Sequence, residues 1–172
     1  MQFRLSRLPS PVGQLLLATD DQARLRALDF EDYESRMHRL LTRQYRTYDL
    51  ISGPAPERIA ESLARYFAGN LAACDSLPVR TKGTSFQQEV WSALRTVAAG
   101  TTQSYGALAS RIGRPSASRA VGLANGANPI AIVVPCHRII GANGDLTGYG
   151  GGLSRKRWLL AHERKHASTL AA

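Results

Sequence analysis

The chain has 172 residues, of which 44% are apolar and 20% are charged, and its formal net charge at pH 7 is +9. This composition is typical of a globular protein rather than a disordered or fibrous one. With only two cysteines, Cys74 and Cys136, a disulfide-rich scaffold and a cysteine-rich zinc site are excluded. The first residues form no apolar leader, and the longest apolar stretch is far shorter than the ~20 residues that span a bilayer, so we expect a cytoplasmic protein without a membrane segment.

The positive charge is concentrated in the second half of the chain. Residues 1–80 contain 11 lysines and arginines against 10 acidic residues, whereas residues 81–172 contain 11 against only three, Glu89, Asp145 and Glu163. This asymmetry favours an acidic partner for the second half, most often nucleic acid. A solubilising surface would explain the charge equally well, so other features must decide. We expect two domains, with the boundary between residues 80 and 81.

The first half has the pattern of a small mixed α/β domain, because apolar residues recur first at strand spacing and then at helix spacing. The predicted strands are residues 13–19 and 23–30, and the predicted helices are residues 34–45 and 56–67. Cys74 is expected to be a small buried or half-buried residue. Residues 75–83 are expected to form a linker.

Three helices are predicted in the second half. Ser85 and Gln88 fit a capping box at the start of a helix that ends near Gly100. Residues 105–112 and 116–126 predict two short helices joined by a glycine turn. Such a pair in a basic region is typical of a helix-turn-helix motif, and an ordinary helical hairpin in a core is the alternative.

The predicted helix 116–126 is unusual for a reader of DNA sequence. A recognition helix normally offers several long polar side chains to base edges. Here Arg119 is the long side chain, and the small residues Ala117, Ala120 and Ala124 recur at helical spacing. We therefore expect DNA binding with little sequence preference, through the minor groove. The alternative is that the alanines pack on the core of the domain.

A candidate reactive centre follows a run of apolar residues. Residues 130–134 predict a buried strand that Pro135 ends, and Cys136, His137 and Arg138 come next. A cysteine beside histidine and arginine is in a setting that favours the thiolate. The same pattern is compatible with a merely structural cysteine. The remaining histidines show no zinc-ligand spacing relative to this pair, so we expect no metal.

The run from Pro135 to Ile139 resembles the signature of the O6-alkylguanine-DNA alkyltransferases, and the resemblance extends from Gly83 to Glu163 with matching order and spacing. The further motifs are Phe86-Gln87, Val90-Trp91, Ser104-Tyr105-Gly106, Arg119-Ala120-Val121-Gly122, Asn128-Pro129, Gly148-Tyr149, Gly151-Gly152 and Leu159-Leu160-Ala161-His162-Glu163. The first half is similar to the amino-terminal domain of bacterial members. The resemblance implies an α+β fold, in which a ribonuclease-H-like sheet domain with helices precedes a mostly helical domain of the winged helix-turn-helix type.

The resemblance also implies direct reversal of DNA alkylation, with assigned roles for five residues. Cys136 would attack the alkyl carbon on O6 of a guanine flipped out of the duplex. His137 would take the thiol proton through a water, and Glu163 would orient that histidine. Tyr105 would assist the leaving guanine at N3 and contact the flipped nucleotide's phosphate, and Asn128 would link the recognition helix to the reactive segment. The product is a thioether that no nearby residue can hydrolyse, so the protein should react once.

The DNA interface and the substrate pocket follow from the same resemblance, which makes Arg119 the residue that fills the gap left in the duplex. Further DNA contacts are expected at Tyr105, Ser116, Ala117, Ala120, Gly122, Ala124 and Asn125, and pocket residues at Tyr149, Gly150, Ile139 and Lys156. Gly150 stands where some relatives have serine or alanine, which predicts room for alkyl groups larger than methyl and for O4-alkylthymine. The expected partner is double-stranded DNA containing O6-alkylguanine, without a cofactor, structural zinc or stable protein partner. Cooperative assembly on DNA stays open.

Two interpretations from other classes remain. A non-reactive lesion-binding protein would keep the helix-turn-helix and the arginine but lack the nucleophile, so the presence of Cys136 argues against it. A cysteine–histidine hydrolase would need an oxyanion site and would leave the Arg119 helix unexplained. Residues 164–172 carry no motif and are expected to be loose.

Overall fold

The chain divides into two compact units in a computed structural model that describes residues 1–170, with side chains described as far as Ala167. Residues 1–82 and the short segment 129–133 make up the first unit. Residues 83–128 and those from 134 onward make up the second. No helix among residues 1–170 combines the length and the apolar character needed to cross a membrane.

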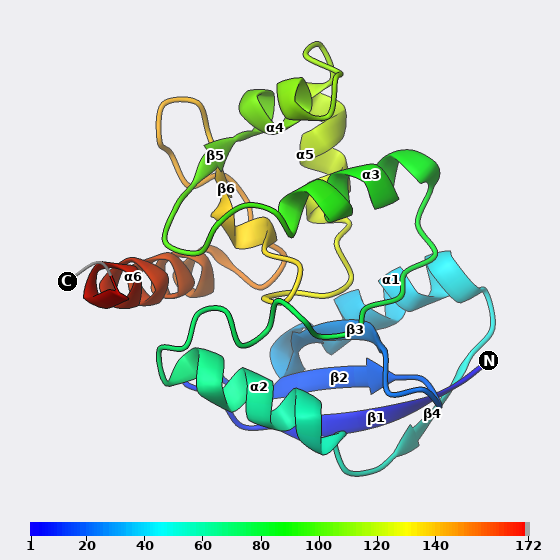
Figure 1. The fold of residues 1–172 in the computed structure, drawn as a ribbon. Helices are drawn as coiled ribbons and strands as arrows, with labels where there is room; N and C mark the ends of the chain where they lie inside the picture. Colours follow the sequence, from blue (N-terminus) through cyan, green and yellow to red (C-terminus); the bar gives the residue numbers. More distant parts are fainter. Residues whose placement is uncertain (171–172) are drawn as a thin grey trace. The chain divides into compact units, whose positions relative to one another are not determined.

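The first unit is built on a four-stranded sheet with the strand order β3-β2-β1-β4 (Figure 1). Its strands are β1 (Gln2–Leu8), β2 (Leu15–Thr19), β3 (Leu25–Phe30) and β4 (Asp49–Ser52). The first three are antiparallel neighbours, and β4 runs parallel to β1. The sequence predicted β2 and β3 and missed the other two. In β1, buried Phe3 and Leu5 alternate with exposed Gln2 and Arg4, whereas β4 is mostly exposed and has no apolar pattern.

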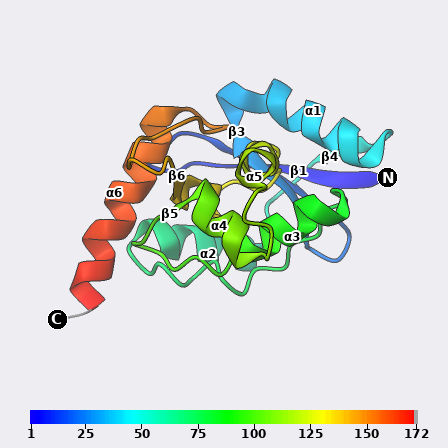
Figure 2. The ribbon, with the colours of Figure 1, turned by 90° about the horizontal axis from the view of Figure 1, so that it is seen from above.

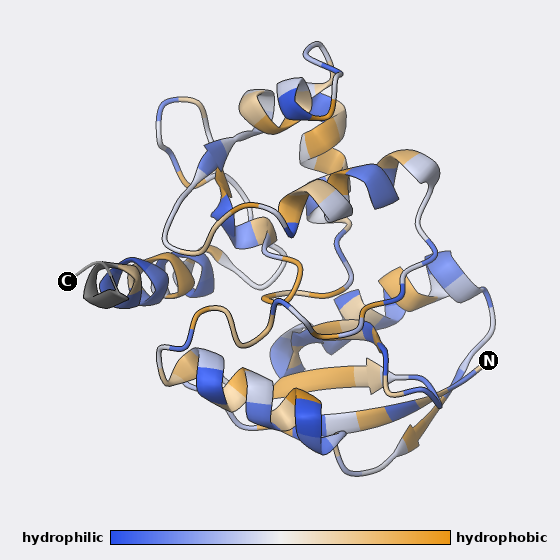
Figure 3. Ribbon diagram, in the orientation of Figure 1, coloured by the Kyte–Doolittle hydropathy of each residue, from blue (hydrophilic) through white to orange (hydrophobic). Residues whose placement is uncertain are grey.

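Helices cover both faces of this sheet, with α1 and α2 on opposite sides (Figures 1 and 2). Their bounds are Glu34–Tyr45 for α1, which follows the 3-10 helix η1 (Glu31–Tyr33), and Glu57–Phe67 for α2. Both predicted helices of the first half are confirmed. Met37 and Leu41 of α1 belong to one buried apolar cluster with Phe3 and Leu16 of the sheet, and β2 is hydrophobic along most of its length (Figure 3).

The predicted linker is bound to the sheet over part of its length. The backbone N–H of Leu25 donates to the Pro78 carbonyl at 2.8 Å, and the Arg80 N–H donates to the Leu25 carbonyl at 2.9 Å. Leu77 and Cys74 beside this segment are buried. These backbone bonds cover part of the free edge of β3, which would otherwise be open to pairing with another chain.

The segment 130–134 is a buried turn, so the prediction of a strand there was wrong. Ile130 forms an isolated bridge with Leu28 of β3, and the chain then turns, with Ile132 at a φ of +68°. A run of apolar residues indicates burial on all sides, and a buried turn satisfies that condition as well as a strand does. Cys136 consequently starts a short helix instead of ending a strand.

The second unit is mostly helical. Its elements are α3 (Ser85–Leu94), β5 (Gln103–Ser104), α4 (Tyr105–Arg111), α5 (Ser118–Gly126), the 3-10 helix η2 (Cys136–Arg138), β6 (Ile139–Ile140) and α6 (Leu153–Leu170). The first helix ends before the predicted Gly100, and α5 begins two residues after the predicted Ser116. The tail predicted to be loose is helical through Leu170, and its last two residues lie outside the described part. In both views α4 and α5 lie side by side, as in a helix-turn-helix (Figures 1 and 2).

The capping box of α3 lies one residue earlier than predicted. The Thr84 hydroxyl accepts from the Gln87 N–H at 3.2 Å, and the Gln87 side-chain oxygen accepts from the Thr84 N–H at 2.9 Å. Ser85 is therefore the first helical residue. Gln88 donates instead to the Gly83 carbonyl at 2.8 Å. Thr84 and Ser85 can each cap a helix, and each is followed three residues later by a glutamine. The sequence alone therefore allows the capping box at either of two positions.

Candidate active site

Cys136 lies at the wall of a cavity of about 340 Å³ in the second unit. The residue is buried, with 4% of its surface exposed. The other walls come from Tyr105 at the start of α4, from Gly122, Asn125 and Gly126 of α5, and from residues 147–150. The structure thus brings the predicted pocket residues Tyr149 and Gly150 together with the predicted nucleophile.

The short parallel pair β5–β6 places Tyr105 beside this cavity. Gln103 is paired with Ile139, so the chain enters α4 at Tyr105 close to the end of η2. The Thr147 hydroxyl donates to the Tyr105 hydroxyl at 3.1 Å, and the phenol in turn lies 3.5 Å from the Thr147 carbonyl oxygen. The phenol therefore has a fixed position among the cavity walls.

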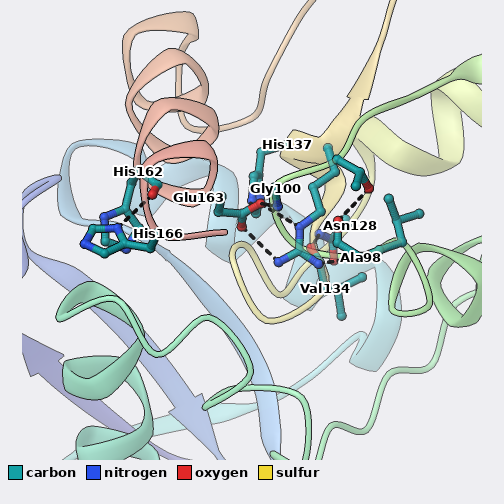
Figure 4. A network of polar contacts seen from close by, with 11 residues as sticks. Ala98, Gly100, Asn128, Val134, His137, His162, Glu163 and His166 are labelled. Carbon is teal, nitrogen blue, oxygen red and sulfur yellow. Dashed lines mark hydrogen bonds and ion pairs between the residues drawn. The ribbon is translucent and has the colours of Figure 1, made fainter. Parts of the chain in front are cut away.

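Glu163 of α6 is the centre of a buried polar network (Figure 4). Its Oε1 lies 2.7 Å from His137 Nε2. Arg138 donates to both carboxylate oxygens, from Nε and Nη2 at 2.9 Å each, and its Nη1 donates to the Val97 carbonyl at 2.6 Å. The Gly100 N–H donates to Oε2 at 3.2 Å. A carboxylate that receives four donors, two of them from a guanidinium fork, is held in one orientation.

Gly100 can take this place because it has no side chain. Its φ is +79°, a conformation that favours glycine, and a Cβ built there would lie 2.5 Å from the Ala167 Cβ. The loop therefore approaches α6 closely enough for its backbone N–H to reach Glu163.

The electrostatics of the network keep His137 neutral and Glu163 ionised. Complete burial lowers the pKa of His137, and the nearby charges of Arg138 and Lys156 lower it further, against the opposing effect of Glu163. Burial alone would raise the pKa of Glu163, but the hydrogen bonds from His137 and Arg138 and the charge of Arg138 hold it well below its usual range. An ionised carboxylate can only accept, so we assign the imidazole proton to Nε2.

This assignment leaves the Nδ1 lone pair of His137 available as a base. Nδ1 is buried and has no hydrogen-bond partner among the described residues. A neutral imidazole with its other nitrogen fixed by a carboxylate has the arrangement that activates a neighbouring nucleophile. The structure thus assembles the residue types needed for nucleophilic chemistry at Cys136.

We predict that the protein loses stability as the pH falls below about 6.5. The folded state holds the pKa of His137 below its ordinary 6.5, so below that pH the unfolded chain takes up a proton that the folded protein does not. Glu163 acts in the same direction below its ordinary pKa of 4.5, because its folded pKa is also lowered. Urea unfolding between pH 8 and pH 4 measures the effect. A His137→Gln variant should show a smaller decline between pH 7 and pH 5, and an equal decline would contradict the attribution to His137.

Lys156 lies behind the cavity wall instead of in the predicted pocket. Its ammonium group is fully buried and donates to the carbonyls of Ile139 at 2.5 Å, Thr147 at 3.2 Å and Gly148 at 3.3 Å. Burial lowers the pKa of Lys156, and the nearby Cys136 opposes that shift. The lysine therefore fastens the loop that carries Tyr149 and Gly150, and it places a positive charge near the sulfur. Ile139, also predicted to face the pocket, is buried, and its N–H donates to the Cys136 carbonyl.

Two buried asparagines join α5 to the segment that carries Cys136. Asn125 Nδ2 donates to the Cys136 carbonyl at 3.3 Å, and Asn128 Nδ2 donates to the Val134 carbonyl at 2.8 Å. Asn128 therefore connects the end of α5 to the residues just before Cys136, and its role as a linking residue stays a prediction. Asn125 was predicted as a DNA contact, and it is instead an inward-facing cavity residue.

The predicted DNA-contact residues are divided between two faces of α5. Arg119, Ala120 and the preceding Ser116 are exposed, while Ala117 and Gly122 are half-buried. Ala124 is buried, so its side chain does not lie on the outer face where a DNA contact was predicted. Its backbone carbonyl accepts from the Trp91 indole at 2.9 Å.

The two histidines of α6 stand apart from the network. His162 and His166 point away from His137 in Figure 4, and the His162 ring stacks on Trp158 with centroids 4.9 Å apart. Within the described residues no three histidine, cysteine or acidic side chains are grouped so that they could hold a metal ion. His137 is therefore the histidine placed to act with Cys136.

Comparisons with known proteins agree with this architecture. A family model described as "6-O-methylguanine DNA methyltransferase, ribonuclease-like domain" matches residues 4–81, and one described as "6-O-methylguanine DNA methyltransferase, DNA binding domain" matches residues 85–165. The methylated-DNA–protein-cysteine methyltransferase of Salmonella typhimurium is 54% identical over 91% of this chain and 93% of its own length. That of Mycolicibacterium paratuberculosis is 50% identical over 92% and 90%. The crystal structure of Mycobacterium tuberculosis OGT in complex with DNA matches with a TM-score of 0.78 and 43% identity, over 96% of this chain and 94% of the other.

A ribonuclease-like unit followed by a DNA-binding unit with a buried cysteine defines a DNA repair protein of the methyltransferase class. The predicted α+β fold is confirmed. The chain belongs to the 6-O-methylguanine DNA methyltransferase family.

Proposed function

We propose that this protein repairs alkylated DNA by direct reversal, with Cys136 as the acceptor of the alkyl group from O6 of guanine. The observation that carries the proposal is the position of Cys136 at the cavity wall, next in sequence to a neutral His137 whose Nδ1 is available as a base. The names of the relatives support it. A non-reactive lesion binder is not favoured, because such a protein would not need this network.

The proposed reaction is a single displacement. His137 takes the thiol proton through a bridging water, and the Cys136 sulfur attacks the alkyl carbon as the bond from that carbon to O6 breaks. The electron pair of the broken bond goes to the guanine ring, which the Tyr105 phenol assists at N3 with a proton or hydrogen bond. The carbon–sulfur bond in the product is a thioether, so each molecule reacts once.

DNA engagement is proposed to use the second unit. Its matched DNA-binding domain carries α5 with exposed Arg119, which would fill the space left by the flipped nucleotide. Positive charge concentrated in this half attracts the phosphate backbone regardless of sequence, so affinity should fall steeply with salt. A cytoplasmic location and specificity for O6-alkylguanine stay predictions.

Peptide mapping by mass spectrometry tests the proposal. The protein is mixed with a duplex containing one O6-methylguanine, and the peptide that carries Cys136 is weighed. We expect a stoichiometric gain of one methyl group, absent in the Cys136→Ser variant. Tight binding without a mass gain would indicate a lesion binder, and turnover of an ester substrate would indicate a hydrolase. Either result would overturn the proposal.

We predict that Gly150 widens the substrate range. Gly150 lines the cavity together with Gly122, Gly126 and Gly148, so much of the wall is bare backbone. A serine side chain at position 150 would take space from a group larger than methyl. The Gly150→Ser variant should therefore react with O6-benzylguanine no faster than the parent. The substitution should change the rate with O6-methylguanine by a smaller factor than the rate with O6-benzylguanine. Faster reaction with the benzyl compound would contradict the prediction. The same comparison on O4-alkylthymine duplexes tests the broader range.

A further inference from the structure

Leu123 is the most exposed large apolar side chain in the described part of the protein, with 74% of its surface accessible. A single exposed leucine needs no explanation by itself, because isolated apolar residues are common on protein surfaces. The position of this one is what matters. It lies on α5, the second helix of the helix-turn-helix, within the matched DNA-binding domain.

The outer face of α5 carries two long side chains, Arg119 and Leu123. The helix buries Val121, Ala124 and Asn125 against its own unit. Residues four apart lie on the same side of a helix, so Arg119 and Leu123 share the opposite side. The remaining exposed positions of α5, all of them described, are small, so these two side chains project beyond an otherwise flat surface.

The inner flank of the same helix forms the wall of the reactive cavity. Gly122 and Gly126, on either side of Leu123 along the chain, line the cavity that contains Cys136. A base that enters this cavity must leave its stack next to α5. The site from which it leaves then exposes apolar faces of the neighbouring bases and sugars to water.

We propose that Leu123 packs against these apolar faces in the minor groove beside the flipped nucleotide, as an apolar contact that complements Arg119. Proteins that bend DNA from the minor groove use leucine and similar side chains as wedges between partly unstacked bases. The leucine here would cover surface that base flipping exposes, and burial of that surface stabilises the complex. The contact rests on the proposed function only in its use of a flipped base, since it concerns DNA binding and not alkyl transfer.

An apolar contact has a signature that separates it from a phosphate contact. Leucine displaces no counterions, so its removal should weaken binding without changing the salt dependence of the affinity. Removal of a phosphate-binding arginine reduces the slope of log Kd against log salt by about one. The salt dependence of the affinity therefore shows whether position 123 makes an apolar contact or acts through the charge of the phosphate backbone.

The experiment measures Kd for a duplex with one O6-methylguanine, in a Cys136→Ser background, across a range of salt concentrations. Leu123→Ala should bind about tenfold more weakly with an unchanged slope, and Leu123→Met, which keeps an apolar side chain of similar size, should bind like the parent. Ile51→Ala is the matched control, because Ile51 is a half-exposed aliphatic residue of the first unit. Parental or tighter binding by Leu123→Ala would overturn the proposal, as would an equal loss in Ile51→Ala.

Reaction with free O6-benzylguanine completes the test, because this compound needs no duplex. It is measured in protein that retains Cys136. Leu123→Ala should react at the parental rate, which shows that the cavity and Cys136 are intact. A rate loss matching the loss of DNA affinity would overturn the proposal, since the substitution would then act through the cavity. If the parent protein transfers no alkyl group at all, the proposed function fails, and weaker DNA binding by Leu123→Ala would still support the contact.

Discussion

Glu163→Gln should slow alkyl transfer by about two orders of magnitude, on the scale of losing an oriented general base. The glutamine side chain has the same shape but no charge, and its amide nitrogen can only donate. Each oxygen of Glu163 accepts two donors from His137, Arg138 and Gly100, so two donors would face the amide nitrogen in either orientation. His137 loses the fixed orientation that leaves Nδ1 available. Single-turnover rates on a duplex containing O6-methylguanine measure the effect.

The same substitution should reduce the free energy of unfolding by about 3–5 kcal/mol, because it strands the buried Arg138 guanidinium without its counter-charge. Glu89→Gln is a matched control in the same unit. Glu89 and Arg114 form an ion pair at 3.1 Å with side chains that are 37% and 55% exposed, and such surface pairs contribute about 0–1 kcal/mol. A Glu163→Gln variant that reacts at the parental rate would show that His137 does not depend on this carboxylate.

The residues that meet at the cavity were largely predictable from the sequence, because their chemistry is local. Cys136 and His137 are adjacent, and the motif around them is distinctive. Their supports were not predictable in the same way. Gly100 acts through a backbone N–H and Arg138 through a carboxylate on a distant helix, and neither interaction has a pattern in the sequence. Thr147, which holds Tyr105, lies in a polar loop with no periodicity at all.

The errors in the fold have a common physical origin. Apolar periodicity reports which side chains are buried, not how the backbone satisfies its hydrogen bonds. Residues 130–134 are buried as predicted, yet their backbone turns. Conversely β4 is a strand whose side chains are mostly exposed, because pairing with β1 alone defines it. Ala124 on α5 is a similar case. A small side chain is compatible both with a close DNA contact and with packing inside the protein, and Ala124 is packed inside.

Arg138→Met should raise the pKa of His137 and move the alkyl-transfer activity to higher pH. In the parent protein, burial and then the charges of Arg138 and Lys156 keep His137 neutral. Loss of the guanidinium removes a charge that lowers the pKa of His137, while the hydrogen bond to Glu163 and the charge of Glu163, which raise that pKa, remain. A protonated imidazole cannot accept the thiol proton. The rate at pH 7 should therefore fall and recover partly as the pH rises through the new pKa.

The stability of this variant should depend on pH with the opposite sign to that of the parent. Where the folded pKa of His137 is raised, the folded state binds the proton more tightly than the unfolded chain, so stability is greater at low pH and is lost as the pH rises through the folded pKa. The parent, with a lowered pKa, loses stability as the pH falls below about 6.5. Urea unfolding at pH 6 and pH 8 shows whether the free energy of unfolding rises or falls with pH. Arg138→Lys keeps the charge but not the bidentate hydrogen bond to Glu163. Its stability should therefore change with pH in the same direction as that of the parent, with a lower free energy of unfolding. The parental sign in Arg138→Met would mean that burial and Lys156 alone keep His137 neutral.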